Sequence, residues 1–244
     1  MLLVAILCGL KVIKHEKLQQ ERIANLEAKI SVIQAENDKD VINWESESYN
    51  YLAIGNSIIK HPINEYWWNE CGMAASTTDK DYVHIVSNAL NANYYAYNFV
   101  TWETMSHDRG EALSMLDGML SDALDLITIQ LSENVTDLST SETDFEELIR
   151  YVQKKCPKAK IIIVGDFWNT KKNVMKIKAC EATNVVFASL DEIRGLSEYK
   201  CGTGTTVCDE AGNPHTVEHK GVAEHPNDEG MQRIANAILQ AGKK

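Results

Sequence analysis

Short apolar segments alternate with amphipathic ones from Tyr51 to Ala241, and this alternation constrains the fold more than any other feature of the chain. The segments that we expect to form strands are residues 51–54, 94–100, 126–131, 161–164 and 185–188. The segments with helical periodicity are residues 79–90, 111–124, 142–155, 173–182 and 227–241. Strands that alternate with helices build a parallel sheet with helices on both of its faces. The sequence therefore predicts an α/β domain around a five-stranded parallel sheet.

The connections between these segments exclude two common nucleotide-binding classes. No glycine-rich dinucleotide fingerprint follows the first strand, and the chain has no P-loop motif. Residues 199–224 form the one long irregular segment, and this segment leads directly to His225. Because loops of this length in a compact domain are usually functional or mobile, we expect it to contribute to a site.

The first forty residues differ in character from the rest. Residues 1–13 are mostly apolar but fall short of the roughly 20 residues that a membrane-spanning helix needs, so they form either a membrane anchor or an apolar helix that docks on the protein. Residues 14–40 lack Gly and Pro and carry Ile and Leu with 3-4-3 spacing. This pattern predicts a helical stalk, which either self-associates as a weak coiled coil or acts as a single spacer. The remaining residues, 41–244, form the predicted domain. If residues 1–13 are a membrane anchor, we expect this domain to lie at the cell surface; if they are not, we expect it to be cytoplasmic.

The net charge and the cysteine spacing argue against two kinds of partner, nucleic acids and metal ions. The formal net charge is -11, and no stripe of Lys and Arg is present. We therefore expect no nucleic-acid partner, because phosphate binding needs clustered basic side chains. No CxxC pair occurs among the six cysteines, so a metal site is not expected. Cys201 and Cys208 flank a short Gly/Thr-rich stretch and leave a disulfide open, since spacing alone does not give the distance between them.

Two residues at opposite ends of the domain suggest nucleophilic chemistry. Ser57 lies in a turn directly after the first expected strand, and His225 lies just before the last expected helix. A serine hydroxyl becomes an effective nucleophile when a histidine accepts its proton. Parallel α/β sheets also place their sites at the loops that follow the strands. We therefore predict that Ser57 and His225 meet in a nucleophilic site.

Four short motifs resemble those of the SGNH, or GDSL-like, hydrolases. Ser57, in the turn Gly-Asn-Ser, matches the nucleophile of the family's Gly-Asp-Ser motif. Gly72 matches the glycine whose backbone N–H helps to bind the oxyanion, and Asn134 matches the oxyanion asparagine. His225, followed by Pro-Asn-Asp-Glu-Gly, matches the histidine that acts as general base.

The resemblance implies a fold and an activity. It implies a three-layer α/β/α, flavodoxin-like domain that acts as an esterase or deacetylase without a metal or organic cofactor. Ser57 would attack the ester carbonyl, and His225 would accept its proton. The N–H groups of Ser57 and Gly72, with the amide of Asn134, would hold the oxyanion.

This chain departs from the family pattern at three positions. Asn56 replaces the usual aspartate, which we expect to alter a turn contact and not the chemistry. Ser132 replaces a glycine, which requires a negative φ at this residue. Val222 stands three residues before His225, where the family has the aspartate that orients the histidine. Glu218, Asp209, Asp228 or a backbone carbonyl could take over that task.

Aromatic side chains near the motifs point to a class of substrate. We expect Trp67, Trp68 and Trp168 to line the cleft together with His61, because aromatic faces suit sugar rings and acyl chains. The predicted activity is hydrolysis of a small carboxyl ester or of an acylated glycan, with O-acetyl groups of a cell-surface glycan as the specific substrate. The alternatives are an acyltransferase or a lipid esterase with the same site, and a surface-tethered glycan-binding protein on a degenerate hydrolase fold.

Overall fold

The structure is a computed structural model, and it describes residues 41–105, 108–168 and 170–243. The predicted anchor and stalk, residues 1–13 and 14–40, lie outside the described residues. Within the described part, no helix combines the length and the apolar character needed to cross a bilayer. Residues 41–42 and 115–119 group apart from the main unit, which comprises residues 43–114 and 120–243. The fold and the site below are those of the main unit.

The main unit contains the predicted five-stranded parallel sheet. Its strands are β1 (Tyr49–Gly55), β2 (Ala92–Asn98), β3 (Leu126–Gln130), β4 (Lys160–Val164) and β5 (Val186–Ala188). They lie in the order β2-β1-β3-β4-β5, and every neighbouring pair is parallel. This is the strand order of flavodoxin-like folds, in which ligands bind beyond the carboxyl ends of the strands where the chain reverses its direction across the sheet. That position lies between β1 and β3.

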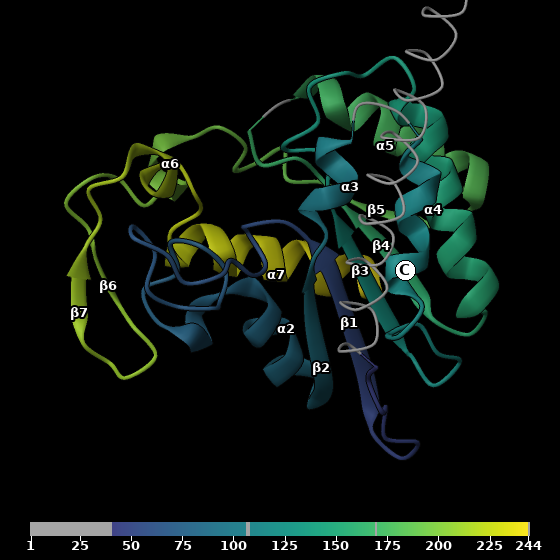
Figure 1. The fold of residues 1–244 in the computed structure, drawn as a ribbon, viewed down its shortest axis with the longest axis horizontal. Helices are drawn as coiled ribbons and strands as arrows, with labels where there is room; N and C mark the ends of the chain where they lie inside the picture. Colours follow the sequence, from purple (N-terminus) through teal and green to yellow (C-terminus); the bar gives the residue numbers. More distant parts are fainter. Residues whose placement is uncertain (1–40, 106–107, 169, 244) are drawn as a thin grey trace, which may run out of the picture. The chain divides into compact units, whose positions relative to one another are not determined.

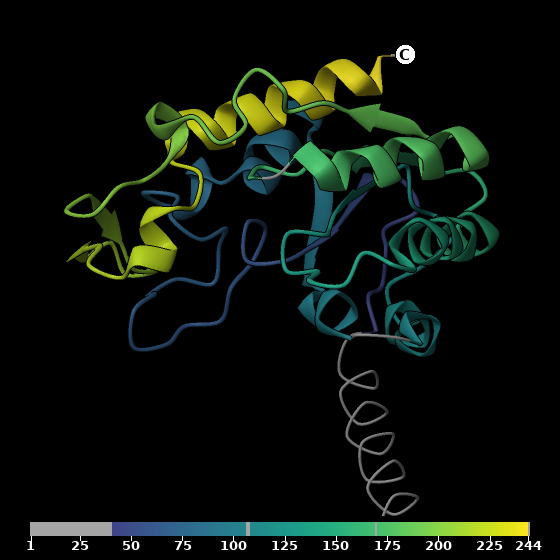
Figure 2. The same ribbon diagram turned by 90° about the horizontal axis from the view of Figure 1, so that it is seen from above.

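Helices cover both faces of the sheet, as the sequence predicts. The longer helices are α2 (Tyr82–Leu90), α4 (Ser141–Lys155), α5 (Thr170–Thr183) and α7 (Asp228–Gly242). Helix α2 packs against α7, and α4 packs against α5, so the two pairs form the outer layers (Figures 1 and 2). The shorter elements are η1 (Thr78–Lys80), α3 (Val100–Thr104), η2 (Arg109–Leu116), η3 (Ser197–Tyr199) and α6 (Lys220–Ala223). The three-layer α/β/α prediction is confirmed.

The core follows from the period of two along each buried strand. In β1, Tyr51 and Ala53 belong to the apolar cluster that includes residues of α2 and α7. Leu52 and Ile54 alternate with them and are also fully buried. Successive strand residues point to opposite faces, so this continuous apolar run is what a strand covered on both sides requires.

Two predicted segments differ from the structure. Residues 111–124 do not form an α-helix but a 3-10 helix, η2, followed by turns, because Ser114, Asp117 and Gly118 have poor helix propensity. The irregular segment 199–224 contains an antiparallel hairpin of β6 (Thr206–Cys208) and β7 (Pro214–Thr216), and then α6. In Figure 1 the hairpin and α6 lie to the left of the sheet, on the way to α7. His225 directly follows this segment.

Candidate functional site

Ser57 lies in the turn that follows β1, at the carboxyl edge of the sheet. Its Oγ is 2.7 Å from Nε2 of His225, a residue 168 positions later in the chain. His225 follows α6, and Asn227 caps α7 by accepting the N–H of Gly230 at 2.8 Å. The sheet edge and the start of α7 thus bring the serine and the histidine into hydrogen-bond contact.

A backbone carbonyl orients the imidazole of His225. Nδ1 lies 2.7 Å from the carbonyl oxygen of Gly221. Because a carbonyl only accepts, Nδ1 carries the proton and Nε2 is left to accept the hydroxyl proton of Ser57. The arrangement is therefore a Ser/His dyad held by the main chain.

None of the carboxylates considered from the sequence is placed at Nδ1 of His225. Asp228 accepts from the N–H and the hydroxyl of Ser76, and Asp209 accepts from Asn213 within the hairpin turn. Val222, at the position of the expected aspartate, is fully buried in the apolar core. Its side chain serves packing, so the main-chain carbonyl is the group that remains for the histidine.

The surroundings of His225 keep its ring neutral. Burial lowers the pKa of the imidazole to about 4, and the nearby His61 and His219 add to this effect. The Gly221 carbonyl acts in the opposite direction but is outweighed by burial. Trp168 packs its ring edge-to-face on the imidazole, with the centroids 5.2 Å apart. A neutral ring with a free Nε2 is the form that accepts a proton at neutral pH.

A pocket of about 410 Å³ opens beside Ser57. Its lining residues are Ser57, His61, Pro62, Asn98, Val100 and Asn134. Asn98 and Val100 were not among the residues expected from the sequence. Asn98 is the last residue of β2 and Val100 lies just after it; β2 pairs with β1, and the carboxyl ends of neighbouring parallel strands meet at one edge. Their position at the end of a strand next to β1 is the sequence feature from which these two pocket residues could have been predicted.

Two hydrogen-bond donors are available beside Ser57. Within the described part of the chain, the backbone N–H of Ser57 has no hydrogen-bond partner. Asn134 is exposed at the pocket, and its Nδ2 uses one N–H to bond Glu103 at 2.6 Å. The second N–H of that amide is free to bind an oxygen atom in the pocket.

Gly72 has a different role from the predicted one. Its N–H donates to Oδ2 of Asp81 at 3.0 Å instead of facing the pocket. A Cβ at this position would lie 2.3 Å from the carbonyl oxygen of Ile58, so only glycine fits here. Gly72 therefore allows close packing beneath the Ser57 turn and is not an oxyanion donor in this structure.

The two smaller departures from the family motif also have structural explanations. Ser132 has φ +115°, so the expectation of a negative φ is wrong. Its strained backbone is held by an N–H bond to Glu103 at 2.6 Å and by a hydroxyl bond to Asp166 at 3.2 Å. Asn56 donates from Nδ2 to both Glu103 and Glu133, at 3.1 and 2.9 Å. An aspartate could not donate to these carboxylates, so the replacement matches its acidic neighbours.

The aromatic residues expected in the cleft have separate positions. Trp67 is fully buried, so its assignment to substrate binding is wrong. Trp68 is half-buried and stacks on His215 of the hairpin at 4.4 Å. Trp168 contacts His225, and His61 lines the pocket with its Nδ1 bonded to the Pro62 carbonyl. Of the four side chains expected in the cleft, only those of Trp168 and His61 lie next to Ser57 and His225.

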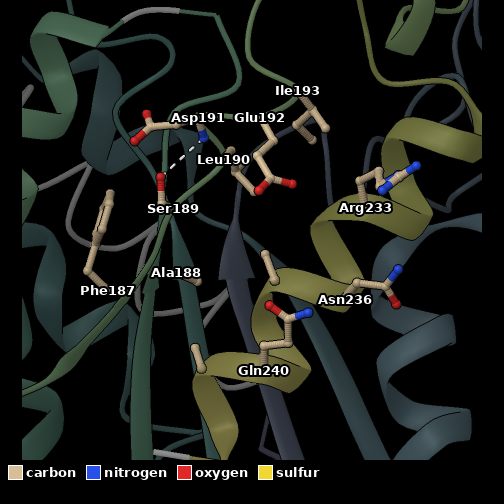
Figure 3. Close-up of a pocket in the computed structure, with 12 residues that line it drawn as sticks. Phe187, Ala188, Ser189, Leu190, Asp191, Glu192, Ile193, Arg233, Asn236 and Gln240 are labelled. Carbon is tan, nitrogen blue, oxygen red and sulfur yellow. Dashed lines mark hydrogen bonds between the residues drawn. The ribbon is translucent and has the colours of Figure 1, made fainter.

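A second pocket, of about 500 Å³, lies between α7 and the end of β5 with the residues that follow it (Figure 3). Residues 187–193 form one wall, and Arg233, Asn236 and Gln240 project from α7. Ser189 accepts the N–H of Asp191 with its hydroxyl, and no histidine lines this pocket. The pocket beside α7 therefore lacks a nucleophile paired with a base, whereas the pocket beside Ser57 has one. The Ser57 pocket is the candidate active site.

The described residues contain neither a disulfide nor a cluster of metal-binding side chains. Cys201 and Cys208 are free thiols, so the disulfide left open by the sequence is not formed here. Among residues 41–105, 108–168 and 170–243, no group of three or more His, Cys, Asp or Glu side chains could hold a metal ion. The chemistry that the site offers is that of a serine activated by a histidine.

Comparison with known proteins identifies the fold. No protein-family model and no curated protein sequence matches the chain. Among solved structures, a two-domain esterase active on acetylated mannans, co-crystallised with mannopentaose, is 17% identical with a TM-score of 0.54. The match covers 88% of this chain and 52% of that one. A protein described as a GDSL-like lipase from Parabacteroides merdae is 16% identical with a TM-score of 0.53, over 83% of this chain and 99% of that one. At these identities the similarity concerns the fold, which is that of the SGNH/GDSL-like hydrolases.

Proposed function

We propose that this chain, which has the SGNH/GDSL-like hydrolase fold, hydrolyses carboxyl esters with Ser57 as the nucleophile and His225 as the general base. The observation that carries the proposal is the 2.7 Å contact between Ser57 Oγ and His225 Nε2, with Nδ1 bonded to a carbonyl. This geometry leaves Nε2 as the acceptor of the hydroxyl proton. The fold places the pair at the carboxyl edge of the sheet, where such folds bind ligands.

The geometry supports a two-step reaction. Nε2 of His225 accepts the proton of Ser57 as Oγ bonds to the ester carbonyl carbon, and the carbonyl oxygen becomes an oxyanion. The N–H of Ser57 and the free N–H of Asn134 stabilise this charge. His225 then returns the proton to the departing alcohol, which leaves an acyl group on Ser57. A water molecule, deprotonated by His225, releases the acid and restores the serine.

We further propose an acetylated glycan as the substrate. Trp168 contacts His225, and two further ring pairs join the segment after β1 to the segment that leads to His225: Trp68 stacks on His215, and Tyr66 stacks on His219 at 4.2 Å. Such rings suit the apolar faces of sugars. The structurally similar esterase is active on acetylated mannans. A cell-surface location is part of this proposal and derives from the sequence of the N-terminal segment.

Acyl specificity tests this function. We expect the full chain to hydrolyse p-nitrophenyl acetate faster than the butyrate and octanoate esters, and to release acetate from acetylated mannan. Initial rates and released acetate are the measurements. Faster turnover of the octanoate ester would favour the lipid esterase instead. No turnover, together with no labelling by a fluorophosphonate, would contradict ester hydrolysis and favour glycan binding.

The pH profile tests the state of His225. The ring accepts a proton only when it is neutral, and its pKa is lowered to about 4. We therefore expect kcat/KM to stay constant from about pH 8 down to about pH 5, and to fall about tenfold per pH unit below about pH 4. The measurement is kcat/KM for p-nitrophenyl acetate, with stability monitored at each pH. A midpoint near 6.5, the ordinary pKa of histidine, would contradict a ring that its surroundings keep neutral.

A further inference from the structure

Glu103 is a buried carboxylate that the proposed reaction does not use directly. It lies in α3, the short helix after β2, and is 1% exposed. Its Oε1 accepts from the N–H of Ser132 at 2.6 Å and from Nδ2 of Asn56 at 3.1 Å. Its Oε2 accepts from Nδ2 of Asn134 at 2.6 Å. One carboxylate thus joins the turn after β1 to the turn after β3.

Amide donors satisfy this buried group, not a cation. Among the described residues, Glu103 takes part in no salt bridge, and the N–H of Asn134 adds a longer contact of 3.4 Å. Burying a carboxylate is unfavourable unless hydrogen bonds compensate for the lost water. Charge-assisted bonds of this kind are shorter and stronger than neutral ones. The arrangement therefore holds its donors tightly in place.

The chemistry of the pair decides how the Asn134 amide is turned. A carboxylate without a proton only accepts hydrogen bonds, so it selects the NH₂ end of a neighbouring amide. One hydrogen of Nδ2 is used by Glu103, and the other remains for the pocket that Asn134 lines. If the amide were turned over, its oxygen would face Glu103 and would be repelled.

We propose that Glu103 is a positioning residue that fixes the Asn134 amide with its second N–H directed at the oxyanion position beside Ser57. The inference rests on the proposed ester hydrolysis. Glu103 acts through Asn134, so its removal should affect the reaction only while Asn134 is present.

A double-mutant cycle tests this dependence. In Glu103→Gln the side chain can donate as well as accept, so the Asn134 amide is free to turn over. We expect kcat for p-nitrophenyl acetate to fall about 10–100-fold with KM nearly unchanged, a share of the about 10²–10³-fold effect of losing an oxyanion donor in Asn134→Ala. In the Asn134→Ala background, Glu103→Gln should change kcat by less than about threefold. Equal losses in both backgrounds, or no loss in the wild-type background, would overturn the proposal.

A control variant accompanies the cycle. Glu142→Gln removes an exposed carboxylate that pairs with Lys178, and it should leave kcat unchanged.

NMR of the wild-type chain tests the same proposal if the Glu103→Gln variant does not fold. The Asn134 side-chain NH₂, assigned by its loss in Asn134→Ala, should show one strongly downfield hydrogen that exchanges slowly. Two hydrogens with ordinary shifts and fast exchange would overturn the proposal. Absence of turnover in the wild type contradicts ester hydrolysis, whereas turnover that Glu103→Gln leaves intact contradicts only this inference.

Discussion

Replacement of Ser57 by alanine is expected to reduce kcat for p-nitrophenyl acetate by at least about a thousandfold. The hydroxyl oxygen forms the bond to the acyl group, and its 2.7 Å contact with His225 is the route by which its proton leaves. His225→Ala should cause a loss of similar size. The double variant should be little worse than either single variant, because the two residues act as one unit.

Kinetics and covalent labelling together test this prediction. A fluorophosphonate should add to the peptide that contains Ser57 in the wild type, and mass spectrometry should find no label in Ser57→Ala. Ser139→Ala serves as the matched control, because Ser139 is exposed and does not line the pocket. Retention of turnover and labelling in Ser57→Ala would show that another residue is the nucleophile.

Restoration of the family's aspartate in Val222→Asp is expected to destabilise the protein and not to raise its activity. Val222 is 0% exposed and packs in the core, so the new carboxylate would be buried without a partner. A buried, unpaired charge reduces the free energy of unfolding by roughly 3–5 kcal/mol. For a domain of this size the melting temperature should fall by at least about 6 °C.

Thermal unfolding of Val222→Asp and of Val174→Asp measures this effect. Val174 is 58% exposed, so the same substitution there should change the melting temperature little. Activity should not rise in Val222→Asp, because the Gly221 carbonyl already holds Nδ1 of His225 at 2.7 Å. A stable Val222→Asp variant with faster turnover would show that the aspartate reaches the histidine.

The sequence predicted local features well where a pattern in neighbouring residues carries them. The apolar runs located β1, β3 and β4, and helical periodicity located α2, α4 and α7. Ser57 was found from its turn after the first strand, and Asn134 from its match to a family motif; the two meet because β1 and β3 are adjacent parallel strands that end at one edge of the sheet. The predicted helix at residues 111–124 was wrong, because apolar spacing alone did not weigh the poor helix formers within it.

Positions within the site were harder to predict, because they depend on packing. Trp67 was expected at the cleft but is buried, since residue type does not reveal which face of a loop a ring will take. Gly72 was expected to donate to the oxyanion, but its N–H bonds Asp81. Asn98 and Val100 were missed, although they line the pocket beside Ser57.

By itself, the sequence determined that this chain builds a parallel sheet with a serine at the end of the first strand and a histidine before the last helix. These features depend on periodicity and order along the chain. Only the tertiary structure decided which group orients His225, which end of the Asn134 amide faces the pocket, and why position 222 holds a valine. Each of these depends on a contact or on burial that packing creates, the last being the core location of Val222. A main-chain carbonyl or a carboxylate from another element leaves no pattern in the sequence, because its role arises from where folding places it.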